Sequence, residues 1–254
     1  MAVGSEFLAA FLLVLARVSG VIALAPLPGA RLFPPTAKIV LAVALAVLLA
    51  PFAAMPAGLT GAGVLTLAIA AGKEAGFGVA VGAALQLVTE MLGLAAQMLG
   101  FQAGYSYINT IDPSTQVDAS ILNVLLTVFG GLLFFTFDLH LHVIRALALS
   151  LTSTPLGTFA AEPAAALRIV RLGASVFETA VRLALPIVAL LLLLDLALTF
   201  LSYVNGRMQL LTLSFTVKIL FALAGLWAIL PLAPRLFGEV GRQALEVVYA
   251  LARP

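Results

Sequence analysis

The sequence predicts an all-α integral membrane protein, on the basis of its composition and its hydrophobic pattern. Of its 254 residues, 63% are hydrophobic and 9% are charged, whereas a soluble domain carries roughly 25% charged residues. A soluble fold could not cover so much apolar surface, but lipid tails solvate it. The apolar runs are long, rich in Ala and Leu, and lack the alternation of a strand. Because backbone groups in hydrocarbon must be satisfied within the segment, these runs are expected to be helices.

The first two helices are expected over residues 6–25 and 38–54. The first is interpreted as a retained segment, because a signal peptide opens with basic residues and the first basic residue here is Arg17. The loop between the two helices is expected to be stiff, since proline cannot continue a helix. Its markers are Pro26, Pro28, Gly29, Pro34 and Pro35.

A long apolar run over 62–100 is expected to form two helices. About 20 apolar residues cross a bilayer, so the run exceeds one crossing, and Lys73 and Glu74 interrupt it among glycines. We therefore expect a short piece over 59–72, either a half-span or a re-entrant segment, and a longer helix over 75–100.

The second half of the chain completes a set of about six to seven apolar helices that pair as hairpins. The stretch over 235–252 alternates charged with apolar residues and predicts an amphipathic interfacial helix. The chain is thus interpreted as a single membrane domain over 1–254, with 235–254 as an amphipathic cytoplasmic tail. The remaining apolar runs are 119–153, 165–204 and 213–234, and the breaks carry Asp112, Pro113 and Ser114, then Pro155, Gly157 and Pro163, then Asn205 and Gly206.

Basic residues predict the sidedness of the chain. If the N-terminus is outside and the piece 59–72 crosses the membrane, every Lys and Arg except Arg207 and Lys218 falls on the cytoplasmic side, in line with the positive-inside rule. The loop over 101–118 then faces the opposite side. The cytoplasmic set is Arg17, Arg31, Lys38, Lys73, Arg145, Arg168, Arg171, Arg182, Arg235, Arg242 and Arg253.

Several chemistries find little support in the sequence. There is no cysteine, so disulfides, thiolate nucleophiles and Cys-ligated metals are excluded. The net charge of +2 and the scattered basic residues do not indicate nucleic-acid binding. No phosphate-binding loop or nucleophile elbow is present. His140 and His142 are two apart and point in different directions on a helix, so a metal site is not expected.

Polar side chains inside apolar runs are expected to face other helices or water. A charge at the bilayer centre costs about 2.5–3.5 kcal/mol on insertion scales. Hydrogen bonds between helices are the simplest interpretation, and a polar lumen or contacts to partner subunits are the alternative. These residues are Gln86, Glu90, Gln97, Gln102, Asp138, His140, His142, Asp195 and Lys218.

A polar, glycine-rich stripe runs along one predicted helix. Its members step by 4, 3, 4, 3 and 4 residues, so they share one helical face. Such a face is suited to close packing against another helix or to a wet pore. The stripe consists of Gln86, Glu90, Gly93, Gln97, Gly100 and Gly104.

Short segments along nearly the whole chain match a known pattern in their order and spacing: Arg17–Gly20, Ala25–Pro26, Pro34–Lys38, Glu74–Gly82, Gln102–Ser106, Ile111–Pro113, Phe134–His140, Ala184–Pro186, Asp195–Leu198, and Lys218 after Met208–Gln209. Together these segments resemble the FliR family, the export-gate subunits of flagellar and injectisome type III secretion. Two positions depart from the family pattern: Leu139 stands where Gly usually precedes His, and Gly206–Leu210 replaces a Pro-Gln-Met-Asn-like segment.

The resemblance implies a non-enzymatic channel subunit without cofactors, in the flagellar basal body of the bacterial inner membrane. It implies assembly with FliP-like and FliQ-like subunits and docking of an FlhB-like switch protein. Unfolded export substrates would pass through the centre, and hairpins would rise out of the usual membrane plane. Asp112–Ser114 and the Arg17–Val18 opening favour flagellar over injectisome service.

The resemblance also implies a pore plug in the loop 102–118. Bulky side chains can fill a narrow lumen, while a glycine and a turn let the loop fold inward. Ordinary packing on a neighbour is the alternative. The plug residues would be Gly104, Tyr105, Tyr107, Ile108, Ile111, Asp112 and Pro113.

Two other functions stay open at this stage. A secondary transporter for a small solute would use Glu90, Asp138 and Asp195 as ion-coupling groups, although no inverted repeat is found. A membrane enzyme would depend on His140.

Overall fold

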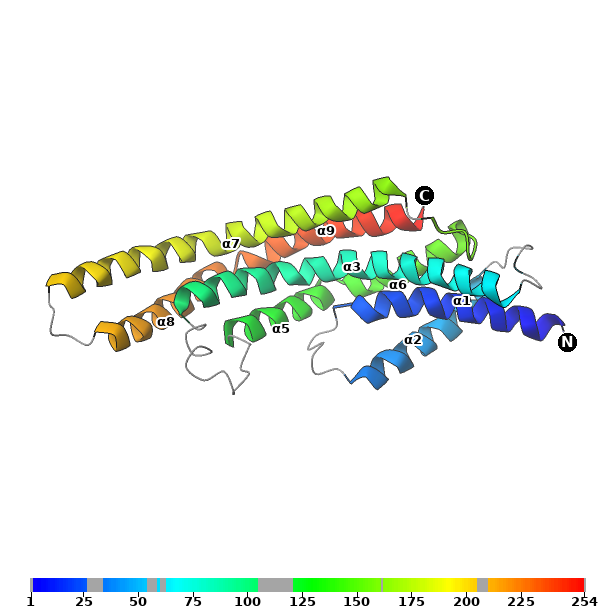
Figure 1. Ribbon diagram of the computed structural model, residues 1–254, viewed down its shortest axis with the longest axis horizontal. Coiled ribbons are helices and arrows are strands. Elements are labelled where there is room, and N and C mark those ends of the chain that lie inside the picture. The colour runs from blue at the N-terminus through cyan, green and yellow to red at the C-terminus, as the bar shows by residue number, and fades with distance from the viewer. Residues whose placement is uncertain are drawn as a thin grey trace.

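The computed structural model is an elongated bundle whose longest helices run along its long axis (Figure 1). It describes residues 2–26, 34–53, 59, 63–104, 121–160, 162–204 and 210–253. Every regular element within these ranges is a helix. The helices are α1 (Ala2–Leu24), α2 (Pro35–Leu49), the 3-10 helix η1 (Ala50–Phe52), α3 (Val64–Ala103), α5 (Ile121–Thr136), α6 (Leu139–Ser153), α7 (Pro163–Val204), α8 (Leu210–Ile229) and α9 (Ala233–Ala252).

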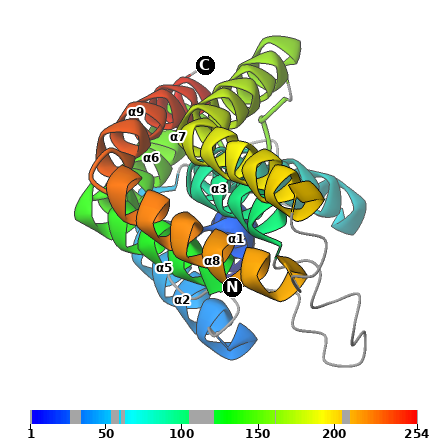
Figure 2. The same ribbon diagram turned by 90° about the vertical axis from the view of Figure 1, so that its left-hand side faces the viewer.

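Helix α3 is the central element of the bundle. It contacts α1, α5, α7, α8 and α9, and in the end-on view of Figure 2 the other helices surround it. Its buried positions continue along most of its length, from Ala70 to Ala103. A helix of 40 residues is about 60 Å long, roughly twice the thickness of a hydrocarbon core.

The expected division of the 62–100 run into 59–72 and 75–100 is wrong, because α3 continues unbroken through Lys73 and Glu74. The charge at Glu74 does not interrupt the helix, since its side chain is fully buried and paired with Arg17. The sidedness assignment required a crossing over 59–72 followed by a turn, so it loses its premise.

Glycines bring α1 and α3 into direct backbone contact. A Cβ atom on Gly78 would collide with the backbone oxygen of Arg17 and lie 2.9 Å from Gly20 Cα. A Cβ atom on Gly20 would lie 2.7 Å from the backbone oxygen of Ala75. Small residues allow this kind of approach between membrane helices. The glycines around Glu74, which suggested a break, instead include one that permits tight packing.

The run 119–153 forms two helices rather than one. α5 and α6 meet at an angle of 59°, and Asp138 at the corner has left-handed backbone angles, with φ of 54° and ψ of 24°. Asp and Asn adopt this conformation more readily than other non-glycine residues. The ring of Phe137, also at the corner, lies 6.0 Å from that of Phe237 on α9. The left-handed backbone of Asp138 thus lies at the bend between α5 and α6. The side chain of Asp138 is exposed.

The amphipathic helix predicted over 235–252 is confirmed as α9. Its apolar side, which includes Phe237, Val240, Ala244 and Val248, is buried. That side contacts α3, α6 and α7, so other helices of the chain cover it. The sequence had predicted that the membrane interface would cover it. α8 and α9 are bent by 62° relative to each other, and after this bend α9 continues to the end of the bundle where α7 begins (Figure 1).

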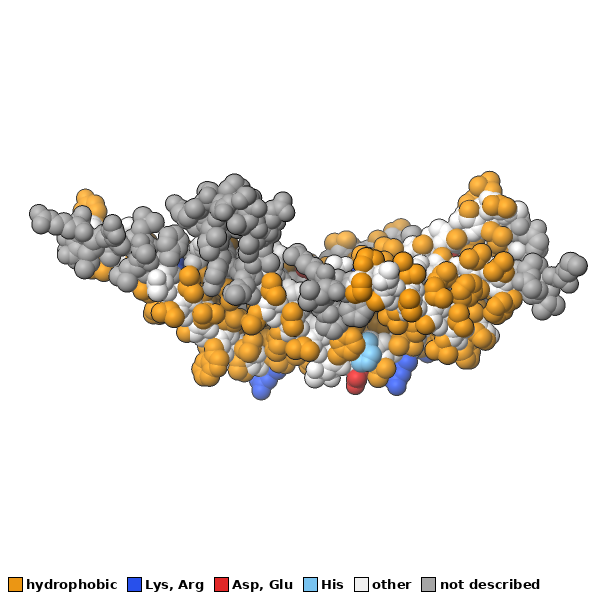
Figure 3. Space-filling view, turned by 90° about the horizontal axis from the view of Figure 1, so that it is seen from below, with side chains coloured by type: hydrophobic (Ala, Val, Ile, Leu, Met, Phe, Trp, Pro, Cys, Tyr) orange, Lys and Arg blue, Asp and Glu red, His pale blue; other side chains and the backbone are white. Residues whose placement is uncertain are grey.

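The helices have the length and composition of membrane spans. Within the described part of the chain, four helices are long and apolar enough to span a membrane. The number rises to six if each of the two bent helix pairs counts as one span. Apolar side chains occupy much of the described part of the face seen in Figure 3. Val64, Phe200 and Trp227 are 85%, 78% and 79% exposed. The prediction of an all-α membrane protein is confirmed. The four single candidates are Phe7–Leu24, Pro35–Phe52, Val64–Ala103 and Pro163–Tyr203.

The α1–α3 contact gives a matched pair of substitutions on one helix. Gly78→Ala places a methyl group against the α1 backbone and is expected to cost about 1–3 kcal/mol of unfolding free energy, as overpacking does. At Gly76, two residues away, the same change meets nothing within 4 Å and is expected to be neutral or to stabilise by up to about 1 kcal/mol through helix propensity. The apparent Tm of each purified variant in detergent measures this; equal Tm values would refute the close contact.

Candidate functional site

The most buried polar site is an ion pair between α1 and α3. Arg17 Nε donates to Glu74 Oε2, and both side chains have 0% exposure. Arg17 Nη1 donates to Ser150 Oγ on α6 at 2.9 Å. Glu74 Oε1 accepts from the backbone N–H of Gly157 at 2.7 Å. The pair thus connects α1, α3, α6 and the α6–α7 turn.

Aromatic rings close this site. The guanidinium carbon of Arg17 lies 4.8 Å from the centroid of the Phe77 ring, and the Phe159 ring meets Phe77 edge-on at 5.3 Å. Arg17 Nη2 is buried and finds no hydrogen-bond partner among the described residues. A charge pair enclosed in this way stabilises the packing and does not line a water-filled path. Arg17 is consequently not a flanking charge that reports sidedness.

A second polar site joins α3, α7 and α8. Asp195 Oδ1 pairs with Lys218 Nζ, while Asp195 Oδ2 accepts from Gln102 Nε2 at 3.1 Å. The side chains of Lys218 and Asp195 are 16% and 35% exposed. Three of the polar residues singled out in apolar runs are therefore brought together, and hydrogen bonding between helices is the interpretation that fits them.

The polar stripe of α3 is split between covered and open positions. Gly93 and Gly100 are buried, whereas Glu90 and Gln97 are exposed. Gln86 Nε2 donates to Glu90 Oε1 at 3.4 Å. Gln97 instead lines an apolar groove of about 490 Å³ that α7 also borders.

Two α5 residues that were not expected from the sequence, Asn123 and Thr127, complete the polar surroundings of Glu90. A Cβ atom on Gly93 would lie 3.4 Å from Glu90 Oε2 and 3.8 Å from Asn123 Oδ1. Thr127 Oγ1 donates to that same Asn123 oxygen at 3.2 Å. The sequence could have indicated these two residues, because Asn123 and Thr127 are four apart in a largely apolar run and so share one helical face.

The two histidines have different surroundings. The His140 ring packs on Phe135 with centroids 4.8 Å apart, and its Nδ1 is buried without a partner in the described ranges. His142 Nδ1 lies 3.0 Å from the Tyr249 hydroxyl of α9. Among the described residues, no three His, Asp or Glu side chains lie close enough together to hold a metal ion.

The acidic groups of the transporter hypothesis have separate environments. Glu90 lies near α5, Asp138 sits exposed at the α5–α6 corner, and Asp195 pairs with Lys218. The structure therefore does not bring them into one ion-coupling site.

The predicted plug falls mainly outside the described residues, since Tyr105, Tyr107, Ile108, Ile111, Asp112 and Pro113 all belong to 105–120. Gly104 is described. It ends α3 with a φ of 87°, and its N–H bonds to the carbonyls of Gly100 and Phe101. Glycine suits this left-handed position, which stops the helix where the predicted loop begins.

Comparison with known proteins gives one consistent result. Residues 8–244 match the family described as Bacterial export proteins, family 1. Flagellar biosynthetic protein FliR of Pectobacterium carotovorum subsp. carotovorum is 31% identical over 88% of this chain and 87% of its own. FliR of Escherichia coli (strain K12) is 28% identical, covering 93% and 92%, and that of Caulobacter vibrioides is 24% identical, covering 84% of each.

Removal of one partner of the buried pair is expected to be more harmful than removal of both. Glu74→Gln leaves Arg17 buried without a counter-charge and should cost about 3–5 kcal/mol of unfolding free energy. Arg17→Met combined with Glu74→Met should recover most of that loss, because apolar residues of similar size fill the same space. The measurement is the apparent Tm of each purified variant in detergent.

The exposed pair Arg182–Glu178 on α7 provides the control for this test. Its side chains are 70% and 63% exposed, so Arg182→Met should change stability by at most about 1 kcal/mol. A Tm for Glu74→Gln equal to that of Arg182→Met would contradict the structural role assigned to the buried pair.

Proposed function

The chain belongs to family 1 of the bacterial export proteins, the family of flagellar biosynthetic protein FliR, and from that membership we propose that it is a channel subunit of the flagellar type III protein export gate. The match over 8–244 carries the proposal, because it extends through nearly all the helices of the chain. The flagellar names of the relatives favour flagellar over injectisome service. The subunit passes unfolded substrates across the bacterial inner membrane at the flagellar basal body and performs no catalysis.

The surface of the bundle supports assembly with other subunits. α3 and α7 have 40 and 42 residues and are about 60 Å long, whereas a hydrocarbon core is about 30 Å thick. Exposed apolar side chains occur near opposite ends of this length, at Val64 on α3 and at Phe200 on α7. A flat bilayer cannot cover both ends at once, so partner subunits cover part of the surface. The proposed partners are FliP-like and FliQ-like subunits, with an FlhB-like switch protein.

The loop after α3 is proposed to plug the channel. The left-handed end of α3 at Gly104 redirects the chain at the start of this loop. The residues that follow include Tyr105, Tyr107, Ile108 and Ile111, whose bulky side chains can fill a narrow lumen and exclude ions. The exposed polar stripe residue Glu90 lies on the helix that leads to the loop, which supports a wet passage beside that helix.

Co-purification tests the export-gate assignment. The chain should be isolated from native membranes in mild detergent, and the proteins that stay bound identified by mass spectrometry. FliP-like and FliQ-like subunits in one defined complex are expected. Recovery of a monomer or homodimer alone would refute the assignment and favour transport of a small solute, which uptake by the purified chain would then measure.

Shortening the loop tests the plug. Deletion of 105–111 is expected to make cells leak ions or small solutes while the complex still assembles, because the side chains that seal the lumen are gone. Replacement of the same residues by an equal number of Gly and Ser keeps the loop length and should also leak. Efflux of potassium from cells measures the leak, and co-purification of partners measures assembly. Tight membranes in both variants, with assembly intact, would contradict a plug.

A further inference from the structure

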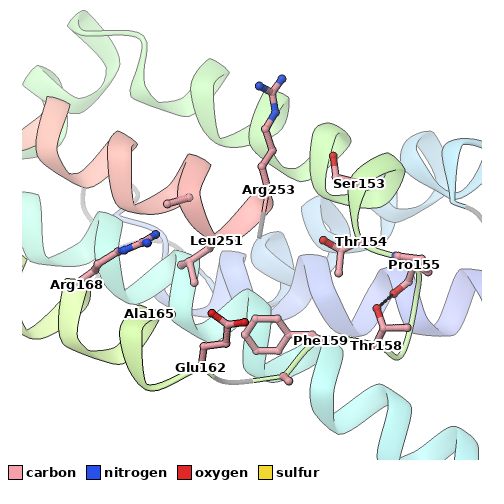
Figure 4. Close-up of a pocket in the computed structure, with 12 residues that line it drawn as sticks. Ser153, Thr154, Pro155, Thr158, Phe159, Glu162, Ala165, Arg168, Leu251 and Arg253 are labelled. Atoms are coloured by element: carbon pink, nitrogen blue, oxygen red, sulfur yellow. Dashed lines mark hydrogen bonds between the residues drawn. The ribbon is translucent and has the colours of Figure 1, made fainter.

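At one end of the bundle, three chain segments enclose a polar pocket of about 390 Å³ (Figure 4). It forms where α6 ends, α7 begins and α9 ends. Its polar lining consists of Ser153, Thr154, Thr158, Glu162, Arg168 and Arg253. We propose that this pocket binds the headgroup of a phospholipid that carries both a phosphate and an ammonium group. The proposal requires only that the chain lies in a membrane and is independent of the export function.

The charged side chains of the pocket form no ion pair with one another or with any other described residue. Arg168, Arg253 and Glu162 are exposed at its wall, and none of them forms an ion pair within the described part of the chain. Arginine binds phosphate oxygens through paired N–H donors. Arg168 lies on α7 and Arg253 at the end of α9, and in Figure 4 the Arg253 side chain points away from Arg168. Because the Arg253 side chain is exposed, it can turn toward the pocket so that both guanidinium groups contact one phosphate.

A buried hydroxyl at this pocket has no hydrogen-bond partner among the described residues. Thr154 is 7% exposed, and its Oγ1 forms no hydrogen bond to any described residue. In Figure 4 this hydroxyl points toward the side of the pocket where Leu251 and Arg253 lie. An unpaired buried hydroxyl is costly, and a bound acceptor oxygen would satisfy it. Thr158 differs, because its Oγ1 already donates to the carbonyl of Pro155 at 2.7 Å.

The first turns of α7 also favour an anion. α7 begins at Pro163 beside the pocket and continues for 42 residues, so the positive end of its dipole faces this region. Glu162 carries the opposite charge and would repel a simple phosphate. A headgroup that bears an ammonium group next to its phosphate can pair with Glu162 and with the two arginines at once. For this reason we assign the ligand to phospholipids that carry both groups.

The rim of the pocket suits the headgroup layer of a membrane. Leu167 and Val170 are 49% and 66% exposed, and they neighbour Arg168 and Arg171 along α7. Exposed apolar residues interleaved with arginines are typical of helices at the interface, where stems contact acyl chains and charged groups reach phosphates. An acyl chain could thus lie on Leu167 and Val170 while its headgroup enters the pocket.

Lipid titration of the assembled protein tests this site. The complex from native membranes, washed free of lipid in mild detergent, is titrated with short-chain phosphatidylethanolamine, and bound lipid is counted by native mass spectrometry. Arg168→Gln and Arg253→Gln should each weaken binding about tenfold, as loss of a charge-assisted contact does. Thr154→Val should weaken it about threefold, through loss of a neutral hydrogen bond. Glu162→Gln should remove the preference for phosphatidylethanolamine over phosphatidylglycerol.

Arg242→Gln is the matched control, because Arg242 is exposed on α9, unpaired among the described residues, and outside the pocket. It should leave lipid binding unchanged. Unaltered binding in both arginine variants would overturn the proposal, as would equal losses in the control. Equal displacement of the lipid by inorganic phosphate would show a site for free anions, and failure of any lipid to bind the intact complex would show that a partner subunit fills the pocket. Either result would overturn the lipid site.

Discussion

The alignment of four segments of the bundle is set by one buried ion pair, Arg17 with Glu74. Two charges taken out of water each cost several kcal/mol, a penalty that only good mutual geometry and further hydrogen bonds offset. Ser150 and the Gly157 amide provide those hydrogen bonds, so the site forms only when α1, α3, α6 and the α6–α7 turn are all in place. The pair therefore fixes how these segments align, which an apolar interface, being non-directional, would specify less well.

The same pair explains why α3 is continuous. A lone glutamate within apolar sequence would favour a loop, where water could solvate it. With Arg17 beside it, Glu74 remains inside the helix, and the small residues Gly20 and Gly78 let the two backbones approach closely enough for the charges to meet. The continuous α3 then provides a common surface for α1, α5, α7, α8 and α9.

Local patterns predicted most of the helices, and the errors came from contacts between distant segments. The runs behind α1, α7 and α9 have clear apolar or amphipathic patterns, so their positions followed from composition and period. The break at Lys73–Glu74 was predicted wrongly because its stabilising partner is 57 residues away. The bend at Asp138 was missed because a left-handed backbone at one residue leaves no hydrophobic signal. Asp195, Gln102 and Lys218 were each identified, but sequence spacing alone could not show that they meet.

The polar residues of this membrane protein differ in how completely other residues of the chain pair with their charges and hydrogen-bonding groups. Arg17 and Glu74 are enclosed and act on the packing, while Asp195 and Lys218 are paired but remain partly exposed. Glu90 is exposed and meets no cation among the described residues, although a bare carboxylate against lipid would be costly. Its side of α3 therefore faces water or polar groups of another subunit. An exposed carboxylate on the central helix of the bundle therefore fits a component of an export apparatus better than a chain that lies alone in lipid.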